Sequence, residues 1–326
     1  MIMKRAFYLL LLTASTQPVL AELGPDGMSG ELTLLAGQYG QRSNFNTNSA
    51  IKDGNLNSSA ESDSEMVFFP LGRINYTFGD NSDKQVFLGT SREDITVGLI
   101  ALELGYQFEL ADSSILAISV LPSLIKDETW SDPFVTGQER VETDVSGNAL
   151  RVQYKNILNS DYSLDGAIYQ REIEDEFSGS DGYATRTAIL DRNGEGIYAR
   201  VSKRYKLSDT RFLTPSFRVN HFDADGEAMS SRLWGANVLY HRAINKHSYA
   251  LSGDYSRSEY DDTHPVFNQT QENTRFSTTL AYEYQTFMGW NNWAFNALLR
   301  YSNTDSNIEF YDETEWLTSI GLSYKF

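Results

Sequence analysis

The chain has 326 residues, no cysteine and a net charge of −17 at pH 7. Without cysteine it has no disulfide framework, no thiolate nucleophile and no sulfur-ligated metal site. Its acidity argues against a nucleic-acid partner, and because it contains no glycine-rich phosphate loop we expect no cofactor.

The first 21 residues predict a cleaved signal peptide. After a short basic start, Ala6–Leu12 form an apolar run that is too short to span a bilayer as a helix. Val19 and Ala21 occupy the positions that small residues take before a signal-peptide cleavage site. The mature protein is then expected to be a single domain, residues 22–326.

Beyond this segment, strand-length stretches of alternating polarity recur almost to the C-terminus. LELGYQFE (residues 102–109) places Leu, Leu, Tyr and Phe on one face and Glu, Gly, Gln and Glu on the other. WAFNALLRYS (293–302) and the terminal TSIGLSYKF (318–326) alternate in the same way. The longest apolar run, near residues 113–127, is broken by Ser119 and Pro122 and is too short for a membrane-spanning helix. The strands therefore have to provide any membrane crossing.

Short turns and long polar loops separate these stretches alternately, as in outer-membrane barrels. The short turns are expected at residues 78–84, 110–113, 159–161, 207–210, 244–247 and 286–292. The long loops are expected at residues 44–64, 127–146, 173–193, 223–230, 261–273 and 304–314.

The sequence thus predicts an all-β fold, a transmembrane antiparallel up-and-down β-barrel with short periplasmic turns and long extracellular loops. It has about 14 strands, or about 12 if the poorly alternating residues 31–42 and 85–92 are not strands.

Aromatic residues gather near the predicted short-turn ends, where interfacial girdles form. The predicted girdle consists of Tyr76, Phe78, Tyr106, Phe108, Trp290, Trp293, Tyr324 and Phe326. The last strand has to pair with the first, because an open edge in hydrocarbon leaves backbone groups without partners. A terminal aromatic such as Phe326 resembles the signal that delivers outer-membrane barrels to the barrel assembly machinery, which we therefore expect as a partner.

Three stretches resemble a known family: PLGRINYTFG (residues 70–79), residues 87–108 and residues 128–151. They are similar to a gammaproteobacterial outer-membrane family of unknown function, DUF2860. The resemblance covers essentially the whole mature chain. It implies a single-domain barrel in the outer membrane, and because the family has no established activity it transfers no site residue.

The polar strand faces predict the lining of the lumen. Strands six to nine are expected to carry a basic arc that faces acidic residues elsewhere on the wall, which would create a transverse field favouring charged solutes. The candidate selectivity residues are Arg151, Lys155, Arg171, Arg200, Arg204 and Arg218, together with Glu103, Glu109, Asp254 and Glu283; Lys206 extends the arc. The alternative is that these charges pair with one another and fill a closed lumen.

These features predict a narrow porin-like channel of the outer membrane for small polar or charged solutes. We expect it to be a monomer in contact with membrane lipid and lipopolysaccharide. The alternative is a closed-lumen barrel that acts as a structural or surface-interaction protein through its acidic extracellular loops.

We do not expect an enzyme or a metal site. His221 lies beside Asp223, and His264 lies beside Asp262, so a hydrolase at the barrel rim is a minor alternative. The acidic loop at residues 223–227 lacks the remaining ligands of a calcium-binding loop.

Overall fold

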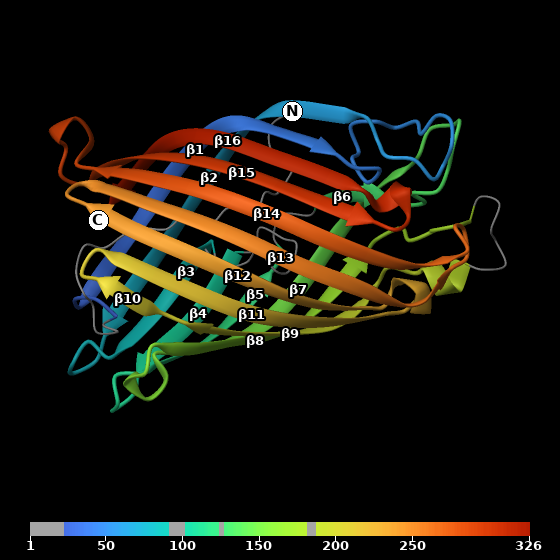
Figure 1. Cartoon of the computed structure of the whole chain (residues 1–326). Coiled ribbons are helices and arrows are strands. Elements are labelled where there is room, and N and C mark those ends of the chain that lie inside the picture. The colour runs from blue at the N-terminus through green and yellow to red at the C-terminus, as the bar shows by residue number, and fades with distance from the viewer. Residues whose placement is uncertain (1–22, 91–101, 124–126, 181–186) are drawn as a thin grey trace.

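A computed structural model describes residues 23–90, 102–123, 127–180 and 187–326, which form one closed β-barrel (Figure 1). The predicted signal peptide, residues 1–21, lies outside the described residues. Within the described part of the chain, no helix has the length and apolarity needed to cross a membrane.

The strand segments are β1 (Gly27–Arg42), β2 (Ser62–Phe78), β3 (Lys84–Thr90), β4 (Leu102–Glu109), β5 (Ile115–Pro122), β6 (Asp127–Trp130), β7 (Glu142–Lys155), β8 (Tyr162–Ile173), β9 (Gly194–Lys203), β10 (Tyr205–Ser208), β11 (Arg211–Ala224), β12 (Ser231–Ile244), β13 (His247–His264), β14 (Gln269–Gln285), β15 (Trp293–Ser306) and β16 (Glu313–Lys325). Short 3₁₀ turns are η1 (Ile157–Asn159), η2 (Thr187–Leu190), η3 (Glu227–Met229), η4 (Phe287–Gly289) and η5 (Glu309–Tyr311).

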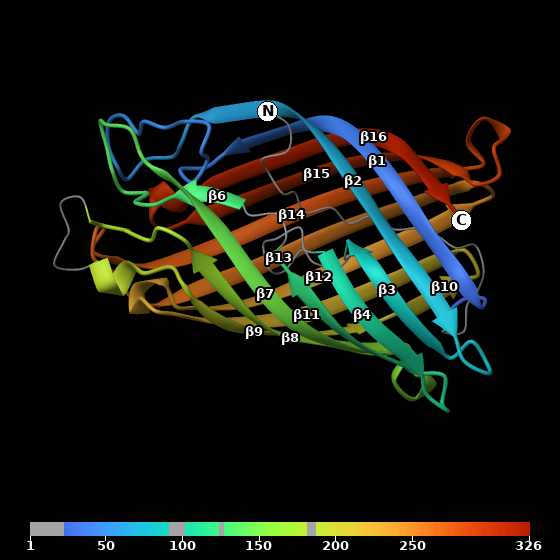
Figure 2. The same ribbon diagram turned by 180° about the vertical axis from the view of Figure 1, so that it is seen from behind.

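Sixteen strand segments make fourteen barrel strands. β5 and β6 both pair with β7, and β9 and β10 both pair with β11, so each of these two pairs forms one interrupted barrel strand. All neighbours are antiparallel, and β16 pairs with β1 to close the barrel (Figure 2). The predicted fold and the count of fourteen are confirmed, and the alternative of twelve is wrong.

The two stretches that alternate poorly are both strands, β1 and β3. In β1 the outward positions include Gly30 and Gly40, where rings of the C-terminal strand lie. A Cβ atom on Gly40 would collide with the indole of Trp316. The inward positions include Leu35 and Tyr39, both buried. Local packing across the closing seam therefore overrides the usual polarity pattern.

All six predicted short turns connect strands at one end of the barrel. The long loops are shorter than expected. The predicted loop at residues 261–273 contains the end of β13 and the start of β14 and leaves only residues 265–268 as a turn, and residues 142–146 belong to β7. These strands continue after their outward face becomes charged, as at Arg257 and Glu259 on β13. Because both faces of these strand ends are polar, their sequence resembles that of a loop, although the backbone remains hydrogen-bonded in the sheet.

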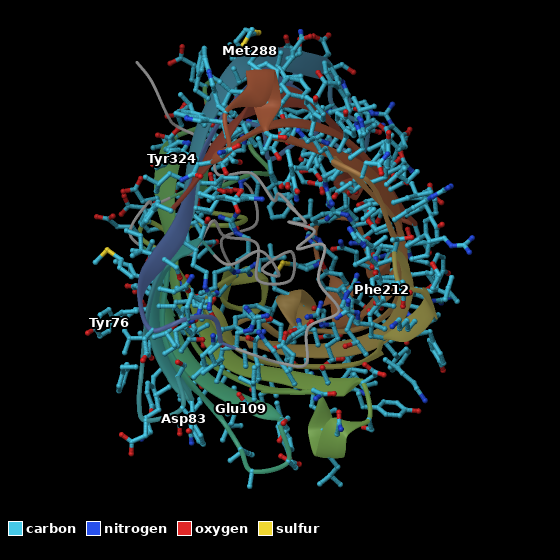
Figure 3. All side chains as sticks on the ribbon, turned by 90° about the vertical axis from the view of Figure 1, so that its left-hand side faces the viewer. Tyr76, Asp83, Glu109, Phe212, Met288 and Tyr324 are labelled. Atoms are coloured by element: carbon cyan, nitrogen blue, oxygen red, sulfur yellow. The ribbon has the colours of Figure 1, made fainter. Side chains whose placement is uncertain are left out.

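The predicted girdle residues line the short-turn end of the barrel in two rows of ring contacts. Successive centroids are 6.0, 6.4 and 5.8 Å apart along Tyr76, Phe78, Tyr106 and Phe108. They are 6.0, 5.2 and 6.2 Å apart along Trp290, Trp293, Tyr324 and Phe326. Figure 3 shows Tyr76 and Tyr324 pointing away from the barrel.

The last residue closes the seam between β16 and β1. The Phe326 N–H donates to the Gly30 carbonyl at 3.0 Å, and the Gly30 N–H donates to the Phe326 carbonyl at 2.8 Å. The Phe326 ring lies over Gly30, where an added Cβ would be 2.8 Å from the ring and 2.7 Å from the Arg73 carbonyl oxygen. Only glycine leaves room for this closure.

We predict that Gly30→Ala lowers the free energy of unfolding by about 1–3 kcal/mol, because the added methyl group meets a backbone carbonyl that cannot move aside cheaply. The measurement is the temperature at which the folded, fast-migrating band is lost on a gel. Gly253→Ala is the control, since a Cβ there has no neighbour within 4 Å. Equal melting of the two variants would contradict the role of the seam.

Candidate functional site

Each connection that the structure describes at the long-loop end contributes side chains to one apolar cluster, here called the dome. Its buried members are Phe134, Leu190, Phe222, Ala224, Ala228, Met229, Ile308, Phe310 and Tyr311, and Phe45, Leu56, Val266 and Phe267 pack against them. Loops that pack on one another in this way cover the end of the barrel and do not extend into solvent.

A buried histidine stands at the centre of the dome. His264 lies beyond the apolar outward band, at the loop end of β13, with ring contacts to Phe134 and Phe267 at 5.1 and 4.8 Å. Its Nδ1 accepts the Val266 N–H at 3.3 Å, so Nε2 carries the hydrogen and donates to the Tyr311 hydroxyl at 2.9 Å. Burial lowers the pKa of His264 to about 4. With both ring nitrogens engaged, His264 is not placed to activate a water molecule.

Arg140 holds two loops of the dome together. Its guanidinium donates to the carbonyl oxygens of Asn44, Ser49 and Ala50 at 2.8, 2.6 and 3.3 Å, and it stacks on the Trp130 ring at 4.3 Å. Burial lowers the pKa of Arg140 to about 10, so the group remains charged at neutral pH. Three carbonyl dipoles solvate a charge that no water reaches easily.

Beneath the dome lies a cavity of about 580 Å³ inside the barrel, here called the chamber. This volume is within the range of small-molecule sites. The lining includes Tyr39, Gln41, Phe45, Tyr169, Arg171, Arg192, Asn220, Phe222, Tyr260, Gln271, Asn273, Tyr311, Glu313 and Glu315. Amides, phenols and aromatic faces surround a few charged groups, a composition suited to orienting a polar solute.

One chamber wall carries an arginine without an acidic partner. The Arg171 Nε donates to the Arg192 carbonyl oxygen at 2.8 Å, and the guanidinium lies over the Phe222 ring at 4.5 Å. No carboxylate among the described residues forms an ion pair with it, whereas Arg192 pairs with Glu176 at 2.7 Å. The side chain of Arg171 therefore offers its remaining N–H groups to the cavity.

The facing wall carries an acidic residue in the same condition. Glu313 accepts a hydrogen bond from the Ser43 hydroxyl at 2.7 Å and forms no ion pair with any residue that the structure describes. Its neighbour Glu315 is bound by Arg275. β8 and β16, which carry Arg171 and Glu313, are the seventh and fourteenth barrel strands, so they lie diametrically opposite. Arg171 and Glu313 therefore lie on opposite sides of the chamber, whose lining also includes the carboxylates of Asp127 and Glu128 on β6.

A belt of alternating charges crosses the wall nearer the short-turn end. Arg73 lies 3.7 Å from Glu103, and Arg151 lies 3.9 Å from Glu103 and 2.7 Å from Asp165. Arg200 lies 3.3 Å from the same Asp165. The predicted basic arc is therefore corrected at this level, because acidic residues are interleaved with the arginines and do not face them across the lumen. Interleaving lowers the cost of burying these charges.

The belt continues on the next strands. Arg218, which is the register partner of Arg200, binds the two Asp254 carboxylate oxygens in a bidentate pair, with one contact at 2.8 Å. Asp254 is thus also a neighbour of the basic arc. β11 and β13, which carry this pair, are separated only by β12.

The other inward-pointing candidates lie near the short turns, away from the chamber. Glu283 is buried and binds the Lys325 ammonium at 2.9 Å. Lys155 and Glu109 are the last residues of β7 and β4. These charges belong to the opposite mouth of the barrel.

Two residues of the predicted arc lie at the short-turn mouth of the barrel and not in the belt. Arg204 is exposed between β9 and β10, with its guanidinium 4.0 Å from the Phe212 ring centroid. Lys206 is half exposed on β10 and pairs with Asp209 at 2.8 Å. Arg204 contacts Phe212, and Lys206 is the register partner of the same residue, so both lie next to this ring at the mouth.

Sequence reasoning missed Arg73, Asp165, Glu313 and Glu315. The first two lie on clearly alternating strands and could have been found by extending the face assignment to β2 and β8. Glu313 falls in the predicted loop at residues 304–314 and Glu315 follows directly after it, although the alternation counted back from Phe326 places both side chains inward. The ion pairs that Arg73, Asp165 and Glu315 form could not be predicted, because the sequence alone does not give the order of the strands in the barrel.

One sector of the inner wall also contains an apolar cluster. Leu35, Tyr39, Val67, Phe69, Ala250, Ala281, Leu298 and Leu317, from β1, β2 and β13–β16, form one buried cluster. Buried polar side chains such as Thr279, Asn296 and Ser319 lie on the same strands as this cluster, so polar residues line the lumen on this side as well.

A family model described as "Protein of unknown function (DUF2860)" matches residues 27–325. No curated protein matches the chain. Among solved structures, the chain is similar to a deletion mutant of the monoaromatic hydrocarbon channel TodX, with 11% identity, TM-score 0.48 and coverage of 95% of this chain and 92% of that one. It is also similar to the outer membrane channel DcaP of Acinetobacter baumannii, with 10% identity, TM-score 0.42 and coverage of 92% and 98%. An anion-selective porin from Comamonas acidovorans has 7% identity, TM-score 0.42 and coverage of 92% and 100%.

We predict that the dome loosens in acid because of His264. Its pKa of about 4 in the folded protein lies below the ordinary value of about 6.5. The contribution to stability is therefore complete above pH 6.5 and falls as the pH decreases towards 4.

The measurement is the rate at which a protease active in acid cleaves the loops at pH 7 and at pH 4. The matched variant is His264→Phe, which keeps the ring and removes the titration. It is expected to show a smaller acid-induced increase. The same increase in both proteins would assign the effect to other groups.

Proposed function

Because the chain belongs to the DUF2860 family of unknown function, its activity has to be argued from the barrel itself, and we propose that it is an outer-membrane channel for small solutes that carry charge. The observation on which this rests is the chamber, whose opposite walls present Arg171 and Glu313, each without an ionic partner among the described residues.

The exterior supports the membrane assignment. Outward residues such as Leu104, Ile168, Val238 and Leu280 are exposed and apolar in the middle of the strands, and aromatic rows follow at the short-turn end. Exposed apolar surface of this extent is stable in contact with lipid. We therefore place the short turns in the periplasm and the dome on the extracellular side.

The chamber favours solutes with both signs of charge. An unpaired guanidinium or carboxylate in a partly buried site is costly unless a ligand compensates it. The anionic group of a solute would compensate Arg171 and a cationic group would compensate Glu313, so a solute with both charges has a favourable contact at either wall. The amide and phenol groups between them, such as Asn220 and Tyr260, would hydrogen-bond its polar body.

A second candidate is a closed barrel that acts at the cell surface. The dome supports it, since loops that pack on one another through Phe134, Met229 and Phe310 leave an ordered surface over the barrel end. In this case the ion pairs of the belt fill the lumen, and their only role is to stabilise the folded barrel. The two candidates differ in whether ions pass.

We predict that the refolded mature protein conducts in planar bilayers and that 4-aminobutyrate, which carries both charges, blocks the current at lower concentration than butyrate or butanol. Arg171→Gln and Glu313→Gln are each expected to raise the half-blocking concentration about tenfold, the usual loss for one hydrogen bond to a charged group.

Arg257→Gln is the control, because Arg257 faces outward and pairs with Glu272 at 2.8 Å. Equal block by the three solutes would remove the chamber from the mechanism. A folded barrel without any conductance would favour the surface role.

We also predict that loosening the dome increases conductance. Arg140→Gln removes the charge that binds three carbonyl oxygens of the neighbouring loop, so the channel is expected to be open for a larger fraction of time. Single-channel recording before and after the substitution gives this fraction. An unchanged fraction in a variant whose loops are cleaved faster by protease would show that the dome does not limit the current.

A further inference from the structure

The aromatic girdle at the short-turn end is interrupted by two arginines that lie side by side. Arg211 on β11 and Arg242 on β12 are register partners, and both are exposed on the outward face. Like charges directly opposite each other on neighbouring strands are destabilising. Their presence on the lipid-facing side therefore calls for a compensating anion.

The outward positions at the same level on other strands are mostly aromatic. They include Tyr76, Phe78, Tyr106, Phe108, Tyr162, Tyr249, Tyr282, Tyr284, Trp293, Phe295 and Tyr324. Two single cations occur there, Lys84 and Lys203. Lys203 is covered by the rings of Tyr162 and Tyr205, at 4.4 and 5.1 Å from their centroids. The arginine pair is thus a different arrangement from the rest of the girdle.

Neither arginine is neutralised by a described residue. The Arg211 Nε donates to the Ser208 hydroxyl at 3.1 Å, which leaves its other N–H groups free. The Arg242 side chain has no hydrogen-bond or ionic partner in the part of the chain that the structure describes. The nearby Asp209 is engaged by Lys206 at 2.8 Å. Two guanidinium forks at this spacing suit an oxyanion with several acceptor atoms.

The residues around the arginine pair favour a lipid over a free anion as its ligand. Towards the middle of the membrane the next outward residues are Leu213 and its register partner Tyr240, and Tyr249 is the register partner of Arg242. An anion at the arginines would have an apolar surface on its membrane side, where acyl chains lie, and phenol groups at the headgroup level.

We propose that Arg211 and Arg242 bind the phosphate of an anionic phospholipid in the periplasmic leaflet of the outer membrane. The site rests on the membrane placement proposed above but is independent of channel activity. A lipid held there would sit against β11 and β12 at the level of the girdle.

The test is native mass spectrometry of the detergent-solubilised mature protein with equal amounts of phosphatidylglycerol and phosphatidylcholine. The wild type is expected to retain phosphatidylglycerol about tenfold more than phosphatidylcholine, as the exchange of one charge-assisted contact predicts. The double variant Arg211→Gln/Arg242→Gln is expected to lose this preference, and each single variant to lose part of it.

Lys84→Gln is the matched control, since it removes a single exposed cation at the same level on β3. Heat-modifiable gel migration shows that each variant is folded, and bilayer conductance shows whether the channel proposal fails separately. Unchanged lipid preference in the folded double variant, or equal retention of both lipids by the wild type, would overturn the proposal. So would displacement of phosphatidylglycerol by millimolar inorganic phosphate, which would identify a site for free anions.

Discussion

The barrel depends on one constraint: every backbone N–H and C=O in the hydrocarbon region has to find its partner within the sheet. Closure of β16 on β1 meets this constraint, and it explains features far from any site. Gly30 and Gly40 are small because the rings of Phe326 and Trp316 lie over them at the seam. Once the strands are closed and their number is fixed, strands seven positions apart face each other, and this brings β8 opposite β16.

Charged residues in the lumen occur in two different arrangements. In the belt, Asp165 is shared by two arginines, so the desolvation cost of each group is offset by its neighbours. In the chamber, Arg171 and Glu313 receive only neutral partners. Arg171 and Glu313 thus differ from the belt residues, because they form hydrogen bonds but no ion pair among the described residues, and this difference is the basis of the solute site proposed above.

Much of the fold was predictable from period-two alternation and turn composition, which gave the barrel class, the strand number and the short turns. Alternation also identified Arg171, Glu103 and Asp254 as inward-facing, because the direction of a side chain follows from its position in the strand. Prediction failed where polarity and backbone pairing diverge. Glu313 lies in a strand that has left the membrane, so its polar neighbours resembled a loop. Ion pairs between strands distant in sequence required the spatial order, and the dome required three-dimensional loop packing.

The way in which Arg140 fastens the dome has a consequence for variation between strains. It binds the main-chain oxygens of Asn44, Ser49 and Ala50, which every residue type supplies. The side chains of Ser49 and Ala50 can therefore change without removing the fastening, whereas the buried Asn44 side chain donates to the carbonyl oxygens of Ser58 and Phe310. A surface loop under selection by antibodies or phages could alter its appearance repeatedly while the barrel beneath it stays closed. Anchoring through the backbone thus separates what the cell surface displays from what the protein needs to remain folded.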